Sequence, residues 1–294
     1  MHKQNPHLNG YDMPALVRAI PELAKHVIKN PRGRETINFS DPVSVKLLNQ
    51  ALLKHHYGVQ VWDLPEGFLC PPIPGRMDYL LAVADLLDGL NISQKIRALD
   101  IGTGANLIYP ILGAAHLGWS WIGSDVDPRS IKHGNLIKDS NKNLKSEIQI
   151  RQQKHGHKIF DGIIQSDEYF DVTVCNPPFH KSAQDAAKGS ARKSANLNRN
   201  KHKRGSTLQG NQALNFSGQS NELWCEGGEK AFVRNMIRES QKYAQQVGLF
   251  TCLVSKKENV KPLVDEVRKL NGQLSVHEMG QGNKISRFLA WSFN

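Results

Sequence analysis

The chain lacks the features that mark secreted proteins, membrane-spanning proteins and proteins stabilised by structural metal ions. It holds only four cysteines in 294 residues, with no C-x-x-C pair and no histidine near a cysteine at zinc-ligand spacing. A disulfide framework or a structural metal is therefore not expected, and a reducing cytoplasm is the expected compartment. No apolar run approaches the roughly 20 residues that cross a bilayer, and residues 1–30 hold no apolar signal segment. We expect a cytoplasmic protein with no metal and no membrane contact.

Acidic residues are also scarce. The chain has 27 Asp and Glu against 38 Lys and Arg, which gives a formal net charge of +11 and a pI near 9.5. An excess of positive charge raises the local concentration of polyanions, and nucleic acid is the commonest polyanionic partner. Charge alone also fits a basic protein without such a partner. At 39% hydrophobic residues, the chain can bury the core of one large domain with appendages.

The pattern of the chain divides it in two. Residues 1–76 form a basic N-terminal extension with short helices expected at 15–29 and 41–55, and it ends in a rigid connector at 62–76 that holds four of the 14 prolines. Residues 77–294 form the main domain. Within it, a basic flexible insertion is expected at 181–222, because 186–221 contain no acidic residue and seven Lys or Arg.

Strands and helices alternate after residue 95, which predicts an α/β fold. The expected strands are 96–101, 119–125, 147–152, 171–176, 248–255, 273–279 and 285–293, and the expected helices are 77–89, 106–117, 128–141, 229–246 and 260–270. Strands separated by helices imply parallel crossovers, and the last two strands are close enough for an antiparallel hairpin. The prediction is a Rossmann-like, seven-stranded, mostly parallel sheet with an antiparallel last strand.

A glycine-rich turn follows the first of these strands in LDIGTGANLIYPILG, residues 99–113. Gly102 and Gly104 allow the backbone to approach a ligand closely. Asp125 ends the next strand, where a carboxylate can accept both ribose hydroxyls of an adenosine cofactor. The turn alone is weak evidence, and an ordinary strand–turn–helix remains the alternative.

Two residues favour S-adenosylmethionine over a dinucleotide. Leu107 stands where the third glycine of a dinucleotide-binding turn would be, so the close packing around a pyrophosphate is not provided for. Asp100 would repel a diphosphate but suits the ammonium group of a bound methionine. Asp127 is a second candidate for the ribose contact, although its place before Pro128 is more typical of a helix cap.

The second motif is Asn176-Pro177-Pro178-Phe179, which follows the strand at 171–176. The carboxyl ends of strands face the ligand crevice in an open α/β sheet. The Asn176 side-chain oxygen and the Pro177 carbonyl can accept the two N–H bonds of an aromatic amine, and the prolines hold that carbonyl in place. Phe179 offers a stacking face for an extruded base. These four residues are the predicted catalytic residues.

The motif predicts methylation of an amine but leaves the acceptor open among adenine N6, guanine N2 and a protein glutamine amide, with the positive charge against the protein substrate. A general base is not required, since the methylated amine is acidic enough to lose a proton to solvent. We therefore interpret His180 as a loop histidine or a phosphate contact rather than as a base.

Several blocks together resemble the ribosomal RNA large subunit methyltransferase F family. They are CPPIPGRMDYLLAVADLL, LDIGTGANLIYPILGA, CNPPFHKS, the GGE at 227–229 and the final LAWSF, and the similarity covers residues 5–294. The resemblance implies a class I methyltransferase fold, S-adenosyl-L-methionine as cofactor and N6 methylation of one adenine in 23S rRNA. It also implies that the partner is 23S rRNA or a large-subunit assembly intermediate. We expect the chain to act as a monomer.

Carried over position by position, the resemblance assigns roles to three of the five predicted cofactor-binding residues. Arg76 matches the arginine that grips the cofactor carboxylate, Gly102 lines the cofactor, and Asp125 holds its ribose where eukaryotic relatives have Glu. Asp100 and Gly104 complete the set. RNA is expected to contact basic residues of the extension and the insertion, namely Arg32, Arg34, Lys188, Arg192, Lys193, Arg199, Lys201, Lys203 and Arg204.

Other classes share parts of this pattern. A guanine-N2 rRNA methyltransferase would share the N-P-P-F-H motif but often repeats its domain, and the chain shows no internal repeat. A DNA adenine methyltransferase would carry a separate target-recognition domain. A non-catalytic RNA-binding protein would need neither Asp125 nor the intact motif at 176–179, and Leu107 argues against a nicotinamide oxidoreductase.

Overall fold

The computed structural model of the chain describes residues 1–89, 94–178, 180–182, 184–185, 224–281 and 284–293. Its elements are α1 (Met13–Ala19), η1 (Pro21–His26), β1 (Val27–Lys29), β2 (Glu35–Ile37), α2 (Pro42–Tyr57), α3 (Ile73–Asp88), β3 (Arg97–Ile101), α4 (Ile108–Leu117), β4 (Ser120–Asp125), α5 (Pro128–Asp139), α6 (Lys142–Lys145), β5 (Ile148–Gln152), β6 (Phe170–Cys175), α9 (Gly228–Ser240), η2 (Gln241–Tyr243), β7 (Val247–Leu253), α10 (Lys257–Lys269), β8 (Gln273–Gln281) and β9 (Lys284–Ser292).

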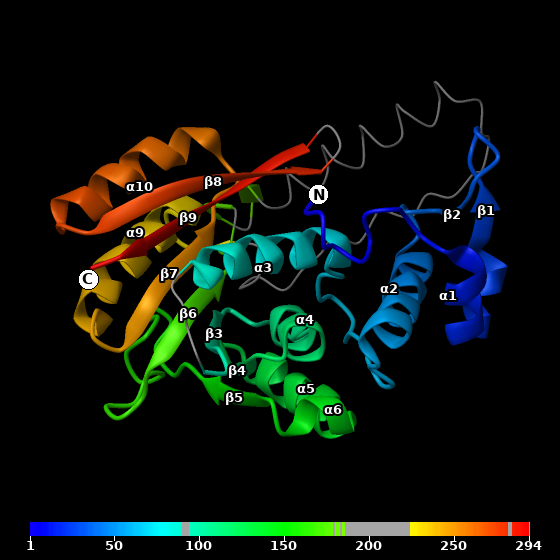
Figure 1. Cartoon of the computed structure of the whole chain (residues 1–294), viewed down its shortest axis with the longest axis horizontal. Coiled ribbons are helices and arrows are strands. Elements are labelled where there is room, and N and C mark those ends of the chain that lie inside the picture. The colour runs from blue at the N-terminus through cyan, green and yellow to red at the C-terminus, as the bar shows by residue number, and fades with distance from the viewer. Residues whose placement is uncertain (90–93, 179, 183, 186–223, 282–283, 294) are drawn as a thin grey trace.

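The main sheet has seven strands in the order β5-β4-β3-β6-β7-β9-β8 (Figure 1). Strands β5, β4, β3, β6 and β7 pair in parallel. Strand β9 runs antiparallel to both of its neighbours, so β8 shares the direction of the parallel strands. The predicted mostly parallel sheet with an antiparallel last strand is confirmed.

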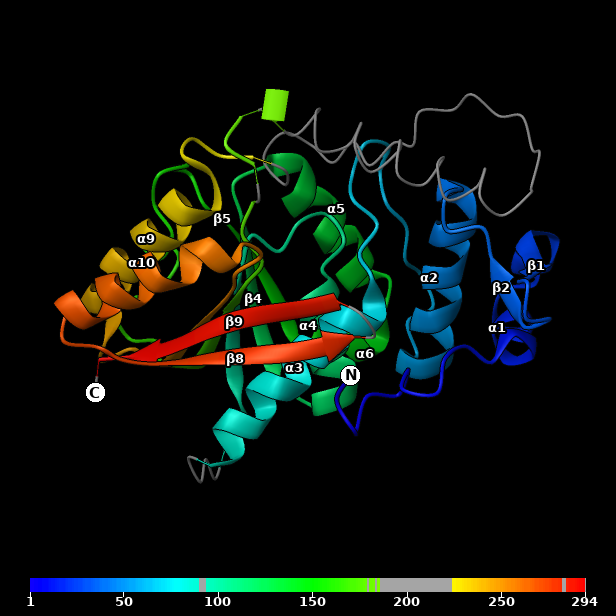
Figure 2. The same ribbon diagram turned by 90° about the horizontal axis from the view of Figure 1, so that it is seen from above.

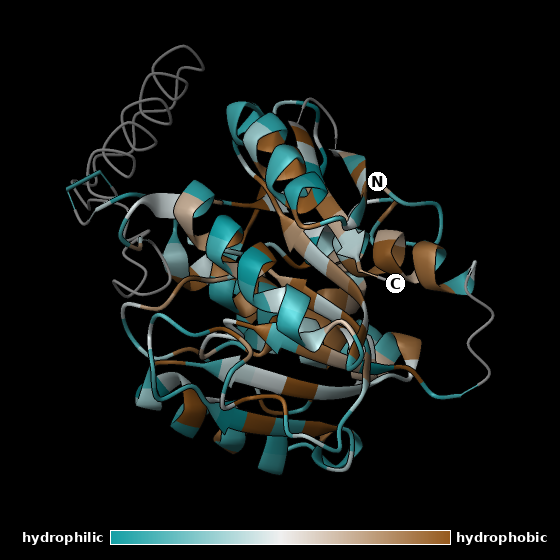
Figure 3. Ribbon diagram, turned by 90° about the vertical axis from the view of Figure 1, so that its left-hand side faces the viewer, coloured by the Kyte–Doolittle hydropathy of each residue, from teal (hydrophilic) through white to brown (hydrophobic). Residues whose placement is uncertain are grey.

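Helices cover both faces of the sheet, and each face has its own hydrophobic core. Alternation along β9 shows the division: Phe288 and Ala290 face the core shared with α3 and α4, whereas Leu289 and Trp291 face the core shared with α9 and α10. The strands are rich in hydrophobic residues while the outer sides of the helices are polar (Figure 3). None of the helices in the described ranges is long and apolar enough to cross a membrane.

The N-terminal extension differs from its prediction. The single helix expected over 15–29 is wrong: the chain forms α1, then η1, then the strand β1, because Pro21 cannot continue the hydrogen bonding of α1. Strand β1 pairs with β2 in an antiparallel hairpin whose tip is residues 30–34. These elements lie beside α2 at the end of the molecule away from α9 and α10 (Figures 1 and 2). Leu16 and Leu23 of the extension belong to the same core as α3 and α4.

Other boundaries shift by a few residues. Helix α3 begins at Ile73, inside the predicted connector, because prolines in a first helical turn cost no hydrogen bond. The helix expected to end at 246 gives way at Ser240 to the short helix η2. The division of the chain at residue 76 stays a prediction.

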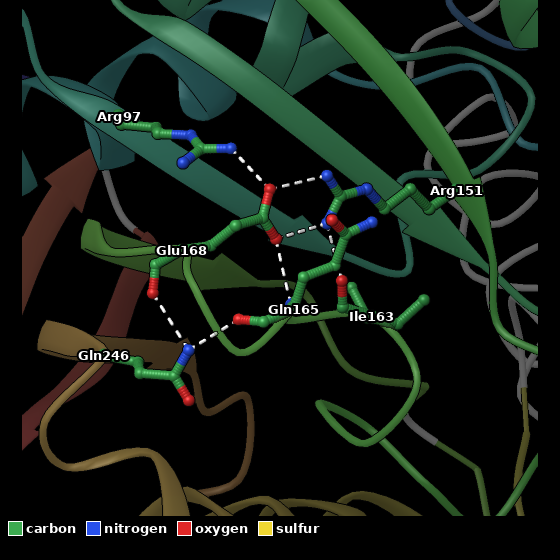
Figure 4. A network of polar contacts seen from close by, with 6 residues as sticks. All are labelled: Arg97, Arg151, Ile163, Gln165, Glu168 and Gln246. Carbon is green, nitrogen blue, oxygen red and sulfur yellow. Dashed lines mark hydrogen bonds and ion pairs between the residues drawn. The ribbon is translucent and has the colours of Figure 1, made fainter.

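One polar network ties strands β3 and β5 to the segment that precedes β6 (Figure 4). The Glu168 carboxylate, 9% exposed, accepts hydrogen bonds from Arg97 of β3 at 2.6 Å and from both terminal nitrogens of Arg151 of β5 at 2.6 and 2.7 Å. The Gln165 backbone N–H adds a further bond at 3.0 Å. These donors, the Arg151 guanidinium first, lower the pKa of Glu168 from 4.5 to about 2.

Candidate active site

A cavity of about 1100 Å³ opens at the carboxyl ends of β3, β4 and β6. This is the edge at which open α/β sheets bind their ligands. Seven of the predicted catalytic and cofactor-binding residues line it: Arg76, Gly102, Gly104, Asp125, Asn176, Pro177 and Pro178. Phe179 lies outside the described residues. The structure thus brings the two sequence motifs into one cavity.

The glycine-rich turn is held against β4 by its own backbone. The N–H groups of Gly102 and Thr103 both donate to the Ser124 carbonyl at 2.9 Å. Gly102 and Gly104 adopt left-handed conformations, with φ of 73° and 65°. A Cβ on Gly102 would meet nothing within 4 Å, so the turn leaves open space over its backbone. A ligand can therefore approach the backbone closely here.

Asp125 connects the turn to the end of β4. One carboxylate oxygen accepts the Gly104 N–H and the other accepts the Asp127 N–H, each at 2.8 Å. Burial raises the pKa of Asp125, and these backbone donors oppose that rise. Each oxygen keeps a second lone pair that can accept a ribose hydroxyl.

Asp127 is the helix cap that its position before Pro128 indicates. Its side chain accepts the Arg129 backbone N–H at 2.9 Å and pairs with the Arg129 guanidinium at 2.7 Å. The carboxylate is therefore engaged within its own helix start, which leaves Asp125 as the better candidate for the ribose.

Asp100 lies behind the turn rather than on the cavity wall. It is buried, and by distance and angle neither carboxylate oxygen has a hydrogen-bond partner among the described residues. Burial is the main cause that raises the pKa of Asp100 from 3.8 to about 7. The Asp125 carboxylate contributes to the rise, while the Thr103 hydroxyl and the Arg76 guanidinium oppose it. A buried carboxylate without a partner is costly, and a cationic ligand group would satisfy it.

Arg76 reaches the cavity from the first turns of α3. Its guanidinium donates to the Tyr109 hydroxyl at 3.0 Å and lies 5.6 Å from the centre of that ring. Tyr109 was not singled out by the sequence, because only the fold brings α4 against α3. The contact fixes the direction of the guanidinium, which can then pair with a ligand carboxylate.

The turn between Gly104 and α4 is supported from the connector. The Trp62 indole N–H donates to the Asn106 carbonyl at 3.0 Å. The next residue, Leu107, is buried and adopts a left-handed φ of 50°. The backbone at this position therefore has a left-handed conformation that glycine adopts more readily than leucine.

A loop after β5 forms another wall that the sequence analysis missed. Gly156, Lys158 and Ile159 line the cavity. The Glu239 carboxylate of α9 accepts the backbone N–H groups of residues 159, 160 and 161 at 2.8 to 3.2 Å. The sequence gives no local sign of this contact, because Glu239 and its partners are 78 to 80 residues apart in the chain.

Asn176 directly follows Cys175, the last residue of β6, which pairs with Ile101 at the end of β3. We call residues 176–179 the acceptor motif, and this register brings its described residues, 176–178, level with the glycine-rich turn. No hydrogen bond among the described residues uses the Asn176 side chain, and Pro177 is buried. Within this part of the chain, no partner of the amide competes with a ligand amine.

The chain leaves the acceptor motif at His180 and returns beside it at Trp224. His180 and Trp224 form a parallel bridge, and the Cys225 N–H donates to the His180 carbonyl at 3.2 Å. The GGE motif follows, and its Glu229 is buried and accepts from the Ser255 N–H at 2.7 Å and the Asn259 amide at 2.8 Å. The motif thus locks the returning chain to the end of β7.

The predicted RNA-binding residues fall in two places. Arg32 and Arg34 are exposed at the tip of the β1–β2 hairpin, where the Asn30 side chain accepts their backbone N–H groups at 2.9 and 3.1 Å. Neither residue lines the cavity. The predicted contacts in the insertion lie outside the described residues: Lys188, Arg192, Lys193, Arg199, Lys201, Lys203 and Arg204.

The cavity therefore suits an adenosine compound that carries an amino acid. On its wall, the Asp125 carboxylate can accept hydroxyl groups, the Arg76 guanidinium can pair with a carboxylate, and the Asn176 amide oxygen can accept from an amine. The Asp100 carboxylate lies buried behind the turn, where it favours a nearby positive charge. Among the described residues, no group of three His, Cys, Asp or Glu is placed to hold a metal ion.

Comparisons with known proteins agree with this chemistry. A family model described as RNA methyltransferase matches residues 1–294. Ribosomal RNA large subunit methyltransferase F of Vibrio cholerae serotype O1 (strain M66-2) is 55% identical over 302 residues, covering 100% of this chain and 83% of that protein. The protein of the same name from Psychrobacter arcticus is 50% identical and is covered over 91% of its length, again with 100% of this chain.

Solved structures of a human protein share the fold. The hMettl16 catalytic domain in complex with MAT2A 3′UTR hairpin 1 aligns with a TM-score of 0.82 at 30% identity, covering 100% of this chain and 96% of that one. The N-terminal domain of human METTL16 in complex with SAH aligns with a TM-score of 0.76 at 26% identity, covering 100% and 99%.

Proposed function

This chain belongs to the RNA methyltransferase family, and we propose that it methylates the N6 amine of one adenine in 23S rRNA. The enzyme is an S-adenosylmethionine-dependent methyltransferase with a Rossmann-like class I fold. The observation that carries the proposal is the meeting of the glycine-rich turn and Asn176 in one cavity. The 23S substrate is supported by relatives named for the large ribosomal subunit.

S-adenosylmethionine supplies an electrophilic methyl group. In the proposal, Asp125 accepts the ribose hydroxyls, Arg76 pairs with the carboxylate, and Asp100 offsets the charge of the ammonium. Gly102 leaves room for the cofactor against the turn, and Gly104 shares its left-handed conformation. These contacts fix the position of the cofactor, so that catalysis is largely a matter of orientation.

The acceptor amine is held by Asn176 and the Pro177 carbonyl. The lone pair of adenine N6 is delocalised into the ring and is a weak nucleophile. Two acceptors on the N–H groups favour the positive charge that develops on nitrogen during attack, and Pro177 and Pro178 hold them in place beforehand. The proton then leaves to solvent, so His180 has no required chemical role. Phe179 is proposed to stack on the extruded base.

The basic parts of the chain are proposed to hold the RNA. Arg32 and Arg34 project from a hairpin tip on the extension, and the seven Lys and Arg of the insertion follow the acceptor motif in sequence. Phosphate contacts of this kind position an RNA without reading its sequence. The expected site of action is the bacterial cytoplasm, where ribosomal subunits assemble.

The experiment is to map methylated nucleosides by mass spectrometry in 23S rRNA. RNA from cells lacking the gene is incubated with the purified enzyme and S-adenosylmethionine, as naked rRNA and as large subunit. We expect one new N6-methyladenosine, absent when Asn176→Ala enzyme is used. New N2-methylguanosine instead would assign the enzyme to the alternative acceptor and overturn the proposal.

A further inference from the structure

Two aromatic residues of the N-terminal extension line the same cavity as Asn176. Tyr11 precedes α1 and Phe39 lies between β2 and α2, so both come from a segment outside the seven-stranded sheet. Their ring centres are 6.5 Å apart with an angle of 35° between the planes. The pair therefore forms one wall of the catalytic cavity, although the proposed chemistry makes no use of it.

Phe39 is open to solvent in a way that packing does not explain. It is 52% exposed, and within the described part of the chain it is the one phenylalanine among the large exposed hydrophobic residues. Tyr11 packs against the hydrophobic core, and burial raises the pKa of its hydroxyl. One ring is thus anchored while the other presents a bare face, which a flat aromatic ligand can cover.

The backbone around Phe39 is fixed. The Asn38 side chain accepts the Ser40 N–H at 3.1 Å, and the Asn38 carbonyl accepts the Asp41 N–H at 2.9 Å. Asp41 in turn caps α2 by accepting the N–H groups of Val43 and Ser44. A ring on a turn held at both ends loses little freedom when a ligand stacks on it, so the site is preorganised.

Charge and position indicate what that ligand is. The segment 1–61 has eight Lys and Arg against four Asp and Glu, and the β2 strand leads from the basic hairpin tip directly to Phe39. When an adenine leaves a stack to enter a cavity, the bases on either side each lose one stacking face. An exposed aromatic ring at the mouth of that cavity can replace the lost face.

We infer that Phe39, supported by Tyr11, stacks on a nucleobase adjacent to the adenine that is methylated. The inference rests on the proposed function and adds to it a contact with a second nucleotide. The extension then contributes base contacts as well as charge, and Phe39 acts as a positioning residue, because it touches neither the cofactor nor the reacting amine.

The test is a thermodynamic cycle between Phe39 and the neighbouring bases. RNA spanning the mapped target is made with the 5′ or the 3′ neighbour intact or abasic, and its affinity is measured for wild type and Phe39→Ala. For one neighbour, we expect removal of the base to weaken wild-type binding about tenfold, as loss of one stacked base does. The same removal should change the affinity of Phe39→Ala by less than about twofold. The inference would be overturned if the losses of RNA affinity caused by base removal and by Phe39→Ala were additive at both neighbours.

Matched variants separate stacking from folding. Phe39→Trp should keep wild-type affinity, and Phe39→Ala should raise the KM for RNA with kcat, cofactor Kd and Tm nearly unchanged. Val43→Ala is the control, because Val43 is 53% exposed on the same segment but does not line the cavity. An equal KM rise in Val43→Ala would also overturn the inference.

The cycle measures binding alone and needs no methyl transfer. If mapping finds a methylated guanine, the proposed function fails, and the same cycle around that guanine still decides whether Phe39 stacks on a neighbour.

Discussion

The side chain of Asn176 has no partner within the described residues and follows directly on β6. Replacing it with alanine should lower kcat by about 10²–10³, because a preorganised acceptor at the reacting nitrogen is lost. Cofactor Kd and the KM for RNA should change much less, since the contact acts on reacting geometry rather than on binding. Single-turnover methylation of the RNA measures this effect.

His180→Ala is the matched control for Asn176→Ala. The His180 ring lies 3.5 Å from the Asp185 carboxylate, on the bridge to Trp224. If proton transfer to solvent suffices, this variant should keep kcat within a fewfold of wild type. Loss of activity in His180→Ala with retention in Asn176→Ala would contradict the proposed role of Asn176 and indicate general-base catalysis instead.

Asp100 is the residue whose charge state should govern cofactor affinity. Because burial raises its pKa to about 7, the carboxyl is protonated below neutrality in the free enzyme and must ionise to pair with an ammonium group. The Kd for S-adenosylmethionine should therefore rise about tenfold per pH unit below 7. Asp100→Asn should remove that dependence. Calorimetry with 5′-methylthioadenosine, which lacks the ammonium, is the control and should give a Kd independent of this carboxyl.

The same residue should cost stability in the free enzyme. The folded state binds a proton at Asp100 up to about pH 7, whereas the unfolded state releases it near 3.8, so stability is lost as pH rises through that window. Asp100→Asn should therefore raise Tm at pH 8 without ligand. A lower Tm at pH 8 would show that the carboxylate is satisfied inside the protein.

At the scale of elements, the start of α4 depends on a leucine in a glycine conformation. Leu107→Ala and Leu107→Gly both remove a buried side chain, which costs about 2–5 kcal/mol. The left-handed φ costs a non-glycine residue about 1–2 kcal/mol, so Leu107→Gly should be the more stable of the two by about 1 kcal/mol. Urea unfolding of both variants measures the difference.

Ile111 provides the control for that pair, because it is buried within the regular part of α4. There glycine should be less stable than alanine by about 1 kcal/mol, the ordinary helix preference. If the glycine variant were also less stable than the alanine variant at Leu107, the left-handed conformation would carry no strain.

The sheet could be predicted because most of its strands are short segments rich in apolar residues, separated by helical patterns and by glycine or polar residues. The same reasoning failed at 15–29, where three-residue strands leave too short a pattern to distinguish from a helix. Cavity residues such as Gly102 and Asn176 could be predicted because they directly follow strands. Tyr109 and Trp62 could not, because their roles depend on packing between elements far apart in sequence.

On the scale of the whole molecule, Glu168 joins β3 and β5 to the segment that enters β6. Its pKa is lowered to about 2, so its contribution to stability is present above pH 4.5 and is lost as pH falls from 4.5 to about 2. Glu168→Gln should lower the free energy of unfolding at pH 7 by about 2 kcal/mol, through loss of charged hydrogen bonds. Wild type and variant should converge toward pH 2. Parallel curves over that range would contradict this account.

Strand β9 is the last of the seven to be synthesised, yet it lies between β7 and β8. Until residues 284–292 emerge from a ribosome, β7 has an open edge and β8 has nothing to pair with. Strands β5, β4, β3, β6 and β7 can therefore pair before synthesis is complete. The part of the sheet made by β9 and β8 can form only after β9 has been synthesised. A frameshift or stop codon just upstream of β9 would delete an interior strand rather than shorten an edge. The nascent methyltransferase would therefore complete its fold only late in its own synthesis.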